Sequence, residues 1–182
     1  MMSSKELTRI SKVLSLVLRH QPELIGIEPD QHGWVDVKLL IQQMNIHNIV
    51  VDRALLDHVV ETNSKKRFTF SDNGEQIRAS QGHSIAVELG YVAQVPPDIL
   101  FHGTAEKSVE SIENTGLEKR DRQHVHLSQD LQTARQVGGR HGKPVVFMVQ
   151  ASMMHQAGYL FYLSDNNVWL TDHVPVQFLA IG

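Results

Sequence analysis

The stretch RFTFSDNGEQIRAS, residues 67–80, decides how the first half of the chain folds. Phe68 and Phe70 alternate with polar residues and so lie on one face of a strand, while the polar run that ends at Gly74 has the residue types of a tight turn. The chain then returns through Ile77. The stretch therefore predicts a β-hairpin, at a point where the preceding pattern has the period of helices.

Three helical patterns precede the hairpin. The first begins near Leu7, the second follows the extended piece GWVDVKLL with Asp36 as its cap, and the third begins at about Asp52. Ser3 and Glu6 have the spacing of a capping box. Three helices and a hairpin favour a winged helix, although any small α+β unit with this order of elements gives the same pattern. The expected buried stripes are Ile10, Val13, Leu14, Val17, Leu18, Leu55, Leu56, Val59 and Val60.

A proline joint follows. VAQVPPDIL contains Pro96 and Pro97, which interrupt both helix and sheet, so we expect one domain at residues 1–95 and a second at residues 96–182.

Short strand patterns fill the second domain. They are ILFH, HVHLS, VVFMVQ, YLFYLS, VWLT and VQFLAI. Helical patterns interrupt them at residues 105–114, with Gly116 as a stop, and near residues 130–137, with Gly138 as a stop. The predicted fold class is α+β, with a mixed α/β lobe after the winged-helix lobe.

Composition limits the classes of protein to consider. The chain has 182 residues, 41% of them apolar, which is enough to form a core. It has no cysteine, and the N-terminal MMSSKELTRISK lacks the pattern of a secretory signal. No apolar run is long enough to span a bilayer. We therefore expect a cytoplasmic protein that does not associate with a membrane. With a net charge of −3, a phosphate site must be built from a few local cations. No feature indicates an obligate protein partner, which is consistent with a monomer.

Two adjacent cation-capable residues stand out in LRHQPEL, residues 18–24. Arg19 and His20 precede Pro22, which cannot continue a helix, and cations in a last turn suit the helix dipole. Taken alone, the stretch favours an ordinary helix end.

Two motifs in the second domain place histidines in strand patterns. FHGT sets His102 at a strand end, before Gly103, where a flat ligand could approach the backbone. In RQHVHLS, alternation puts His124 and His126 on one face of a strand. Such a pair could bind zinc, but no carboxylate or cysteine completes a ligand set, so zinc is the less favoured interpretation.

The glycine patterns argue against two common nucleotide sites, the Rossmann and Walker types. The sequence has no G-x-G-x-x-G after a strand and no P-loop. QVGGRHG follows a helix and is better explained as a cap and loop, although Arg140 and His141 could reach a ligand phosphate.

Several segments resemble, in order, those of the NAD-dependent RNA 2′-phosphotransferase family, which removes a splice-junction 2′-phosphate from tRNA. They are LSLVLRHQPELIGIEPDQHGWVDVKLL, KKRFTF, QGHSI, LFHGT, GLEKRDRQHVHLS and GKPVVFMV. The resemblance covers nearly the whole chain. It implies a winged-helix lobe that binds RNA and an ADP-ribosyltransferase-like lobe that binds NAD as a consumed co-substrate, with no metal.

The resemblance also implies a reaction in two steps. The RNA 2′-phosphate attacks the anomeric carbon of the nicotinamide ribose and expels nicotinamide. A ribose hydroxyl of the ADP-ribosylated RNA then attacks the phosphate, which releases 2′-hydroxyl RNA and ADP-ribose 1″,2″-cyclic phosphate.

The family's essential residues fall on Arg19, His20, Arg67 and Arg122 of this sequence. Guanidinium groups suit a phosphomonoester dianion, which Arg19 and Arg67 would hold. The imidazole of His20 would donate to a phosphate oxygen or assist proton transfer, and Arg122 would orient the phosphate. Arg120 lies close enough in sequence to compete with Arg122 for that role.

A second set would contact NAD. His102 would contact the ribose or adenylate, Gly103 and Thr104 the carboxamide, and Ser128 a ribose or phosphate. The three-position pattern of ADP-ribosyltransferases falls on His102, His126 and Val168. Many ADP-ribosyltransferases that act on protein have a glutamate at the third position, and its absence suits a nucleophile that is already an anion. The implied cofactor-binding residues are His102, Gly103, Thr104, His126 and Ser128.

Simpler explanations and rival functions remain. Arg67 and Arg122 could be ordinary exposed cations, and His126 a strand histidine with its hydrogen bonds satisfied. One rival function is a winged-helix regulator that senses NAD without turnover. Another is an ADP-ribosyltransferase that modifies protein or a nucleic-acid terminal phosphate and stops after the first step.

Overall fold

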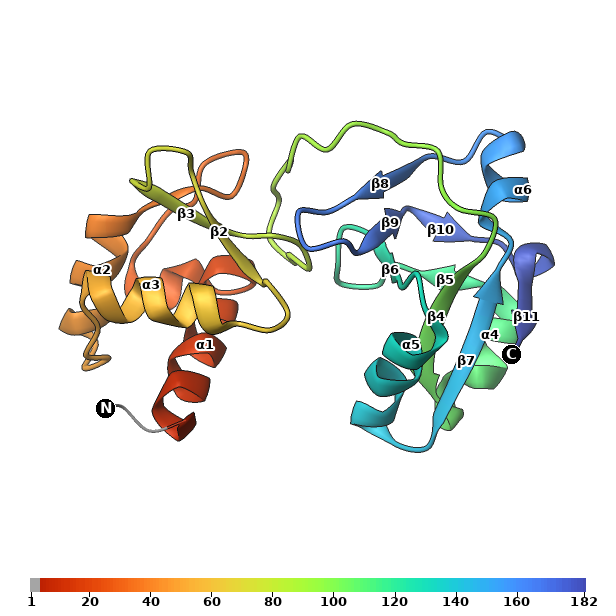
Figure 1. Ribbon diagram of the computed structural model, residues 1–182, viewed down its shortest axis with the longest axis horizontal. Helices are drawn as coiled ribbons and strands as arrows, with labels where there is room; N and C mark the ends of the chain where they lie inside the picture. The colour runs from red at the N-terminus through yellow and green to blue at the C-terminus, as the bar shows by residue number, and fades with distance from the viewer. Residues whose placement is uncertain (1–3) are drawn as a thin grey trace. The chain divides into compact units, whose positions relative to one another are not determined.

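The chain forms two compact units. The structure is a computed structural model that describes residues 4–182. The units are Met1–Gly90 and Tyr91–Gly182, hereafter unit 1 and unit 2 (Figure 1). Pro96 and Pro97, where the sequence places its domain boundary, lie shortly after the start of unit 2, in a segment with little regular structure.

Three helices of unit 1 agree with the predicted patterns. They are α1 (Ser4–Arg19), α2 (Val37–Ile46) and α3 (Arg53–Thr62). Asp36 caps α2 and Asp52 caps α3, and each carboxylate accepts a 2.8 Å hydrogen bond from a backbone N–H in the first turn of its helix. The sequence predicted the cap at Asp36 and a helix start at about Asp52.

The end of α1 also agrees with the sequence. Arg19 is its last residue, and a 3-10 turn begins at Pro22 (Pro22–Ile25). The backbone explanation of LRHQPEL is therefore confirmed. The expected capping box involves Ser3, which lies outside the described residues.

The predicted hairpin forms one side of a three-stranded antiparallel sheet in unit 1. Its strands, in the order β1-β3-β2, are β1 (Val35–Asp36), β3 (Gln76–Ala79) and β2 (Phe68–Phe70). Ile77 lies opposite Phe70 on one side and Val35 on the other. Phe68 and Ile77 are buried with the apolar faces of the three helices in a single core. The helices and the hairpin therefore fold around each other, as the periodicity predicts.

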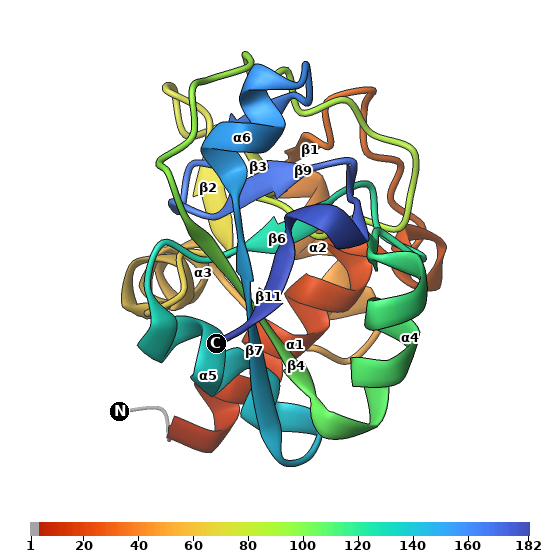
Figure 2. The ribbon, with the colours of Figure 1, turned by 90° about the vertical axis from the view of Figure 1, so that its right-hand side faces the viewer.

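Unit 2 consists of small antiparallel sheets with short helices. Its strands are β4 (Leu100–Ala105), β5 (Leu117–Glu118), β6 (Val125–Leu127), β7 (Pro144–Val149), β8 (Phe161–Leu163), β9 (Trp169–Thr171), β10 (His173–Val174) and β11 (Leu179–Ile181). Its helices are α4 (Val109–Thr115), α5 (Leu131–Gly138) and α6 (Ala151–Gln156). The sheet orders are β11-β7-β4, β6-β9-β8 and β10-β5. Figure 2 shows β11, β7 and β4 running alongside each other, and α5 packs on β4 and β7.

A backbone exchange joins the two larger sheets. The N–H of Phe101 donates to the carbonyl of Ser128 at 2.9 Å, and the N–H of Ser128 donates to the carbonyl of Phe101 at 2.8 Å. The segments FHGT and HVHLS, distant in sequence, therefore lie side by side.

The structure corrects the prediction for FHGT. His102 was expected at a strand end, but β4 continues through Gly103 and Thr104 to Ala105. A Cβ on Gly103 would overlap the carbonyl oxygen of Ala134 in α5. The glycine thus lets a helix cross the strand at very short distance, which is a packing reason for its presence.

Gly138 is the second glycine of this crossing. A Cβ there would lie 2.6 Å from the carbonyl oxygen of Thr104. Gly138 was expected to act as a helix stop, and it is the last residue of α5.

Other short elements of unit 2 differ from the sequence patterns. VQFLAI was expected to be a strand, but it begins as a 3-10 turn at Val176–Phe178, because the Phe178 N–H bonds the carbonyl of Pro175, and only its last three residues form β11. The helix expected from residue 105 begins with the 3-10 turn Glu106–Ser108 before α4. The sequence did not predict α6, β5 or β10.

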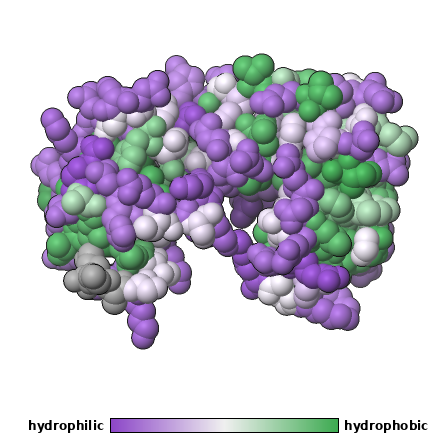
Figure 3. All heavy atoms as spheres, viewed as in Figure 1, coloured by the Kyte–Doolittle hydropathy of each residue, from purple (hydrophilic) through white to green (hydrophobic). Residues whose placement is uncertain are grey.

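The fold is thus a mixture of helices and small antiparallel sheets, as predicted at the level of class. The winged-helix and ADP-ribosyltransferase-like assignments of the two lobes stay predictions. Among residues 4–182, none of the helices combines the length and the apolar character needed to cross a membrane. Figure 3 shows hydrophilic residues over much of the visible surface of each unit.

Candidate active site

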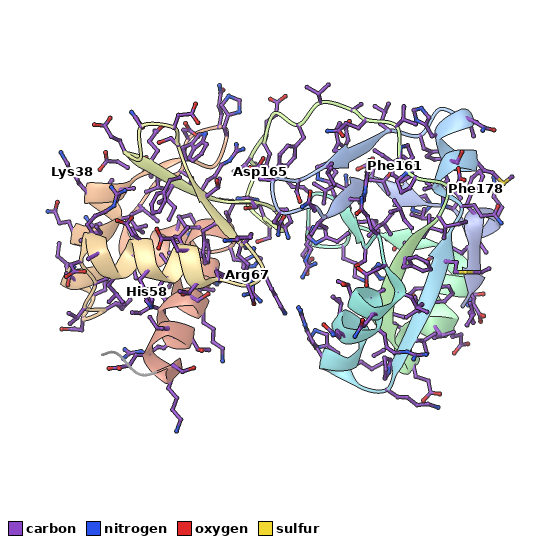
Figure 4. All side chains as sticks on the ribbon, viewed as in Figure 1. Lys38, His58, Arg67, Phe161, Asp165 and Phe178 are labelled. Carbon is purple, nitrogen blue, oxygen red and sulfur yellow. The ribbon has the colours of Figure 1, made fainter. Side chains whose placement is uncertain are left out.

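In unit 1, the segment after β3 holds three of the predicted residues in place. The N–H of Ser80 donates to the carbonyl of Arg67 at 2.8 Å, which continues the hairpin by one residue pair. Four residues later, the N–H of Ser84 donates to the carbonyl of Arg19 at 2.9 Å. Arg67, labelled in Figure 4, directly precedes β2, and Arg19 ends α1. Residues 80–84 therefore link the backbones of both arginines.

The same segment fixes the ring of His20. The hydroxyl of Ser84 lies 2.9 Å from His20 Nδ1, so this nitrogen has a hydrogen-bond partner within the protein. The side chain itself is exposed. One short segment, residues 80–84, thus contacts Arg19, His20 and Arg67.

His83 lies buried in this segment and was not predicted. Its side chain is 1% exposed, and neither ring nitrogen has a hydrogen-bond partner. Burial, together with the nearby positive charges of Arg19, Arg78 and His20, lowers the pKa of His83 from 6.5 to about 4. His83 is therefore a neutral imidazole at physiological pH.

Arg78, also not predicted, is one of the cations whose charge acts on His83. Its side chain is 9% exposed, and its guanidinium lies 4.5 Å from the centre of the Trp34 ring. It donates to the carbonyl of Leu89 at 3.2 Å. QGHSI was among the segments that carry the family resemblance, but nothing in its residue pattern marks a buried histidine or its neighbouring cation.

In unit 2, three predicted residues form one hydrogen-bonded chain. His102 in β4 donates from Nδ1 to the backbone carbonyl of His126 at 3.0 Å. The guanidinium of Arg122 donates to Nδ1 of His126 at 3.2 Å. RQHVHLS and FHGT therefore supply a connected set of polar groups, which the sequence placed only in separate motifs.

These contacts fix the tautomers of both rings. His102 carries its hydrogen on Nδ1, and because burial lowers its pKa the ring is neutral, with Nε2 as an acceptor. His126 accepts at Nδ1 and so carries a hydrogen on Nε2. One ring thus offers an acceptor and the other a donor.

The remaining predicted residues lie beside this chain. Gly103 and Thr104 follow His102 in β4, and Ser128 is the residue whose backbone exchanges hydrogen bonds with Phe101. Val168 precedes β9 and donates its N–H to the hydroxyl of Ser164 at 3.0 Å. It lies just before Trp169, which pairs with Leu127 of β6.

Arg120 and the alternative zinc site have other surroundings. Arg120 is exposed with a φ of 52°, whereas Arg122 contacts His126, so the geometry favours Arg122 for the site.

The ring of His124, which the sequence offered as a possible zinc ligand, packs against Tyr162, with centroids 5.6 Å apart. Within residues 4–182, no group of three or more His, Asp or Glu side chains could hold a metal ion. Arg140 and His141 are exposed in the 3-10 turn Gly139–His141 after α5.

Comparison with known proteins identifies the family. The model of the RNA 2′-phosphotransferase, Tpt1 / KptA family matches residues 5–173. A probable RNA 2′-phosphotransferase of Nostoc punctiforme is 53% identical over 98% of both chains. Proteins with the same name from Flavobacterium johnsoniae and Pectobacterium atrosepticum are 52% identical over 93% of both chains, and 48% identical over 97% of this chain and 98% of the relative, respectively. A match of this extent places the protein in the RNA 2′-phosphotransferase family.

Proposed function

We propose that this protein is an NAD-dependent RNA 2′-phosphotransferase that removes an internal 2′-phosphate from RNA. Membership of the family supports the activity, and one structural observation carries the assignment of residues. Residues 80–84 bind the backbones of Arg19 and Arg67 and the ring of His20, so one short segment holds all three residues. The two arginines supply the local positive charge that a phosphate dianion requires in a protein with a net charge of −3.

In the proposal, unit 1 holds the phosphate. Arg19 and Arg67 bind its oxygens with planar guanidinium groups, whose charge is permanent at all working pH values. His20, held at Nδ1 by Ser84, uses Nε2 to donate a proton toward the oxygen of the scissile P–O2′ bond. Each donor aimed at charge that develops in the transition state contributes about 3 to 4 kcal/mol.

Unit 2 would bind NAD, and its residues fit that ligand. A dinucleotide presents ribose hydroxyls, which both donate and accept, and a carboxamide with the same property. His102 Nε2 is an acceptor and His126 Nε2–H a donor, while Thr104 and Ser128 add hydroxyls on the adjoining strands. In this structure Gly103 is explained by the α5 crossing, so a role in carboxamide recognition would be additional to its packing role.

The bound NAD supplies an electrophilic anomeric carbon with nicotinamide as leaving group. A phosphate oxygen forms the new bond to this carbon as the bond to nicotinamide breaks. The ribose 2″-hydroxyl then attacks phosphorus, the P–O2′ bond breaks, and a proton restores the RNA 2′-hydroxyl. Val168, at the third position of the pattern, has no group that could act as a base, and a phosphate nucleophile requires none.

The first experiment incubates the protein with a short RNA that carries one internal 2′-phosphate, with and without NAD, and follows RNA mass and nicotinamide release. We expect NAD-dependent loss of the phosphate, equimolar nicotinamide and a cyclic phosphate of ADP-ribose. RNA that stays heavier by one ADP-ribose would instead indicate a terminal or arrested ADP-ribosyltransferase. Binding of NAD with no change in RNA or nicotinamide would indicate an NAD-sensing regulator.

Two variants test the division of roles. His20→Ala should slow the second step more than the first, so that RNA heavier by one ADP-ribose accumulates. Arg122→Ala should instead slow nicotinamide release, because it removes both a cation and the partner of His126 Nδ1. If His20→Ala leaves only unreacted RNA, its assignment to the second step is wrong.

A further inference from the structure

One face of α1 carries only positive charge. Lys5, Arg9 and Lys12 recur at intervals of four and three residues and therefore lie on one side of the helix, which we call the basic face of α1. All three are exposed, and the buried residues Ile10 and Leu14 lie on the opposite side. Arg19 comes seven residues after Lys12, two turns further along the same line.

No acidic side chain neutralises this face within the described residues. Lys5, Arg9 and Lys12 take part in no ion pair there, and Glu6, the one acid in α1, is rotated by about 100° from Lys5 around the helix. Residues 1–90 contain ten Lys and Arg and eleven Asp and Glu, yet seven of these ten cations lie in α1 or at residues 65–67. The positive charge of unit 1 is therefore gathered on one part of a nearly neutral unit.

The loop after α3 adds to the same surface. The side-chain amide of Asn63 donates to the hydroxyl of Ser11 at 3.0 Å, which holds this loop against the middle of α1. Its carbonyl oxygen accepts from the N–H of Lys65 at 3.2 Å and so fixes the turn. Lys65 and Lys66 follow directly and lead to Arg67.

An ordinary solvent-facing helix would carry mixed charges, as α3 does. Arg53 of α3 is paired with Asp57 one turn later at 2.7 Å, and Glu61 follows a further turn on. The third helix of the unit, the one that a winged-helix regulator would place in a DNA groove, is therefore electrostatically balanced, whereas the first is not. Figure 1 shows the first turns of α1 extending beyond α3, and in Figure 3 hydrophilic side chains project from that end of unit 1.

We propose that the basic face of α1 binds the phosphodiester backbone of the RNA strand next to the 2′-phosphate. The proposal rests on the proposed function, because it assumes that Arg19, at the C-terminal end of α1, binds the 2′-phosphate. From Lys5 to Arg19 the face is about 21 Å long, enough to follow several nucleotides. Lysine and arginine along a helix recognise phosphates without reading bases, so the contact is independent of sequence.

The test compares two double variants of the full-length protein. Lys5→Gln/Lys12→Gln removes two charges from the basic face, and Lys38→Gln/Lys107→Gln removes two from exposed positions in α2 (Lys38 is labelled in Figure 4) and in unit 2. Glutamine has a helix propensity close to that of lysine, so α1 should keep its stability. The probe is a single-stranded RNA of roughly 20 nucleotides without a 2′-phosphate, and its affinity is measured by fluorescence anisotropy at several salt concentrations.

We expect the slope of log affinity against log salt to fall by about 1.4 in the α1 variant, because each lost phosphate contact accounts for about 0.7 on a single strand. The control variant should keep the slope of the unmodified protein. Equal slopes for all three proteins, an equal loss in the control, or no measurable binding by the unmodified protein would each overturn the proposal.

A second assay separates this proposal from the proposed function. The α1 variant should lose more turnover of a 2′-phosphorylated RNA of roughly 20 nucleotides than of a trinucleotide with a 2′-phosphate, since the longer RNA can follow more of the basic face. Failure of the unmodified protein to act on any 2′-phosphorylated RNA would refute the proposed function, while the anisotropy result on plain RNA would still report on the basic face.

Discussion

Ser84 sets the orientation of the exposed His20 ring in unit 1. Ser84 holds His20 Nδ1 through its hydroxyl and holds the end of α1 through its backbone N–H. Of these two contacts, only the first depends on the side chain. Substitution can therefore separate the orientation of the ring from the position of the helix.

Ser84→Ala should lower kcat for 2′-phosphate removal roughly tenfold with little change in KM, because the ring loses its fixed orientation while the arginines stay in place. Ser84 is exposed, so the melting temperature should hardly change. Ser84→Thr keeps the hydroxyl and should restore most of the rate. Loss of rate in the threonine variant as well would show that the hydroxyl is not what matters.

His83 should give the protein a specific sensitivity to acid. Its folded-state pKa of about 4 lies below the unfolded value of 6.5, so between these values the unfolded chain binds a proton that the folded chain does not. Stability is therefore complete above pH 6.5, falls as the pH drops toward 4, and loses about 3 kcal/mol in all. Denaturant unfolding at several pH values measures this loss.

The comparison uses two variants. His83→Leu should abolish this part of the pH dependence, whatever its effect on stability at neutral pH. Val87→Ala, a neighbour of His83 around Gly33, should shift stability by the same amount at every pH, because it changes packing alone. An unchanged pH dependence in the leucine variant would contradict the role of His83.

At the scale of elements, the crossing of α5 over β4 depends on two glycines. Gly103→Ala or Gly138→Ala should destabilise the protein by about 3 kcal/mol or more, since the new methyl groups meet backbone atoms that cannot turn aside. Gly139→Ala is the matched control. Its Cβ would have only Pro144, at 4.0 Å, as a neighbour, and its φ of −66° is normal for alanine. Chemical denaturation of the three variants checks the order.

The same crossing shows how far the sequence could be interpreted. The helices and hairpin of unit 1 were predictable, because their patterns are long and their caps, Asp36 and Asp52, are local signals. In unit 2 the strands were recognised but their ends were not. A glycine in FHGT looks like a strand end until α5 is seen lying across it, and this contact is between residues far apart in sequence.

The candidate site divides in the same way. Arg19, His20, Arg67 and Arg122 could be named from family resemblance, and their motifs are visible in the sequence. The hydrogen bonds between Ser84 and His20 and between Arg122 and His126 could not be predicted from the sequence, because each depends on the course of a loop between elements. Neither His83 nor Arg78 has any local pattern that distinguishes it from a surface residue.

At the scale of the whole molecule, the two units have separate cores. The buried side chains around Leu14 and Leu40 belong to unit 1, and those around Phe147 and Phe161 belong to unit 2, with no residue in common. Unfolding should therefore depart from two-state behaviour, and scanning calorimetry should give a calorimetric enthalpy larger than the van't Hoff enthalpy.

Variants assign the transitions. Leu14→Ala should lower the midpoint temperature of the transition that belongs to unit 1, and Gly103→Ala that of the transition that belongs to unit 2. A non-reactive NAD analogue should raise only the transition that Gly103→Ala lowers, because a ligand stabilises the unit to which it binds. A single transition shifted equally by both variants would mean that the units unfold together.

The uneven charge of unit 1 should also affect the rate at which the protein associates with RNA. A body with almost no net charge but with its cations on one side has a large electric dipole, and the field of a polyanion turns such a body before the two touch. An RNA would then meet α1 in most encounters rather than by chance. Association should be fast in dilute buffer and slow markedly as added ions screen the field, even though the protein itself is slightly negative.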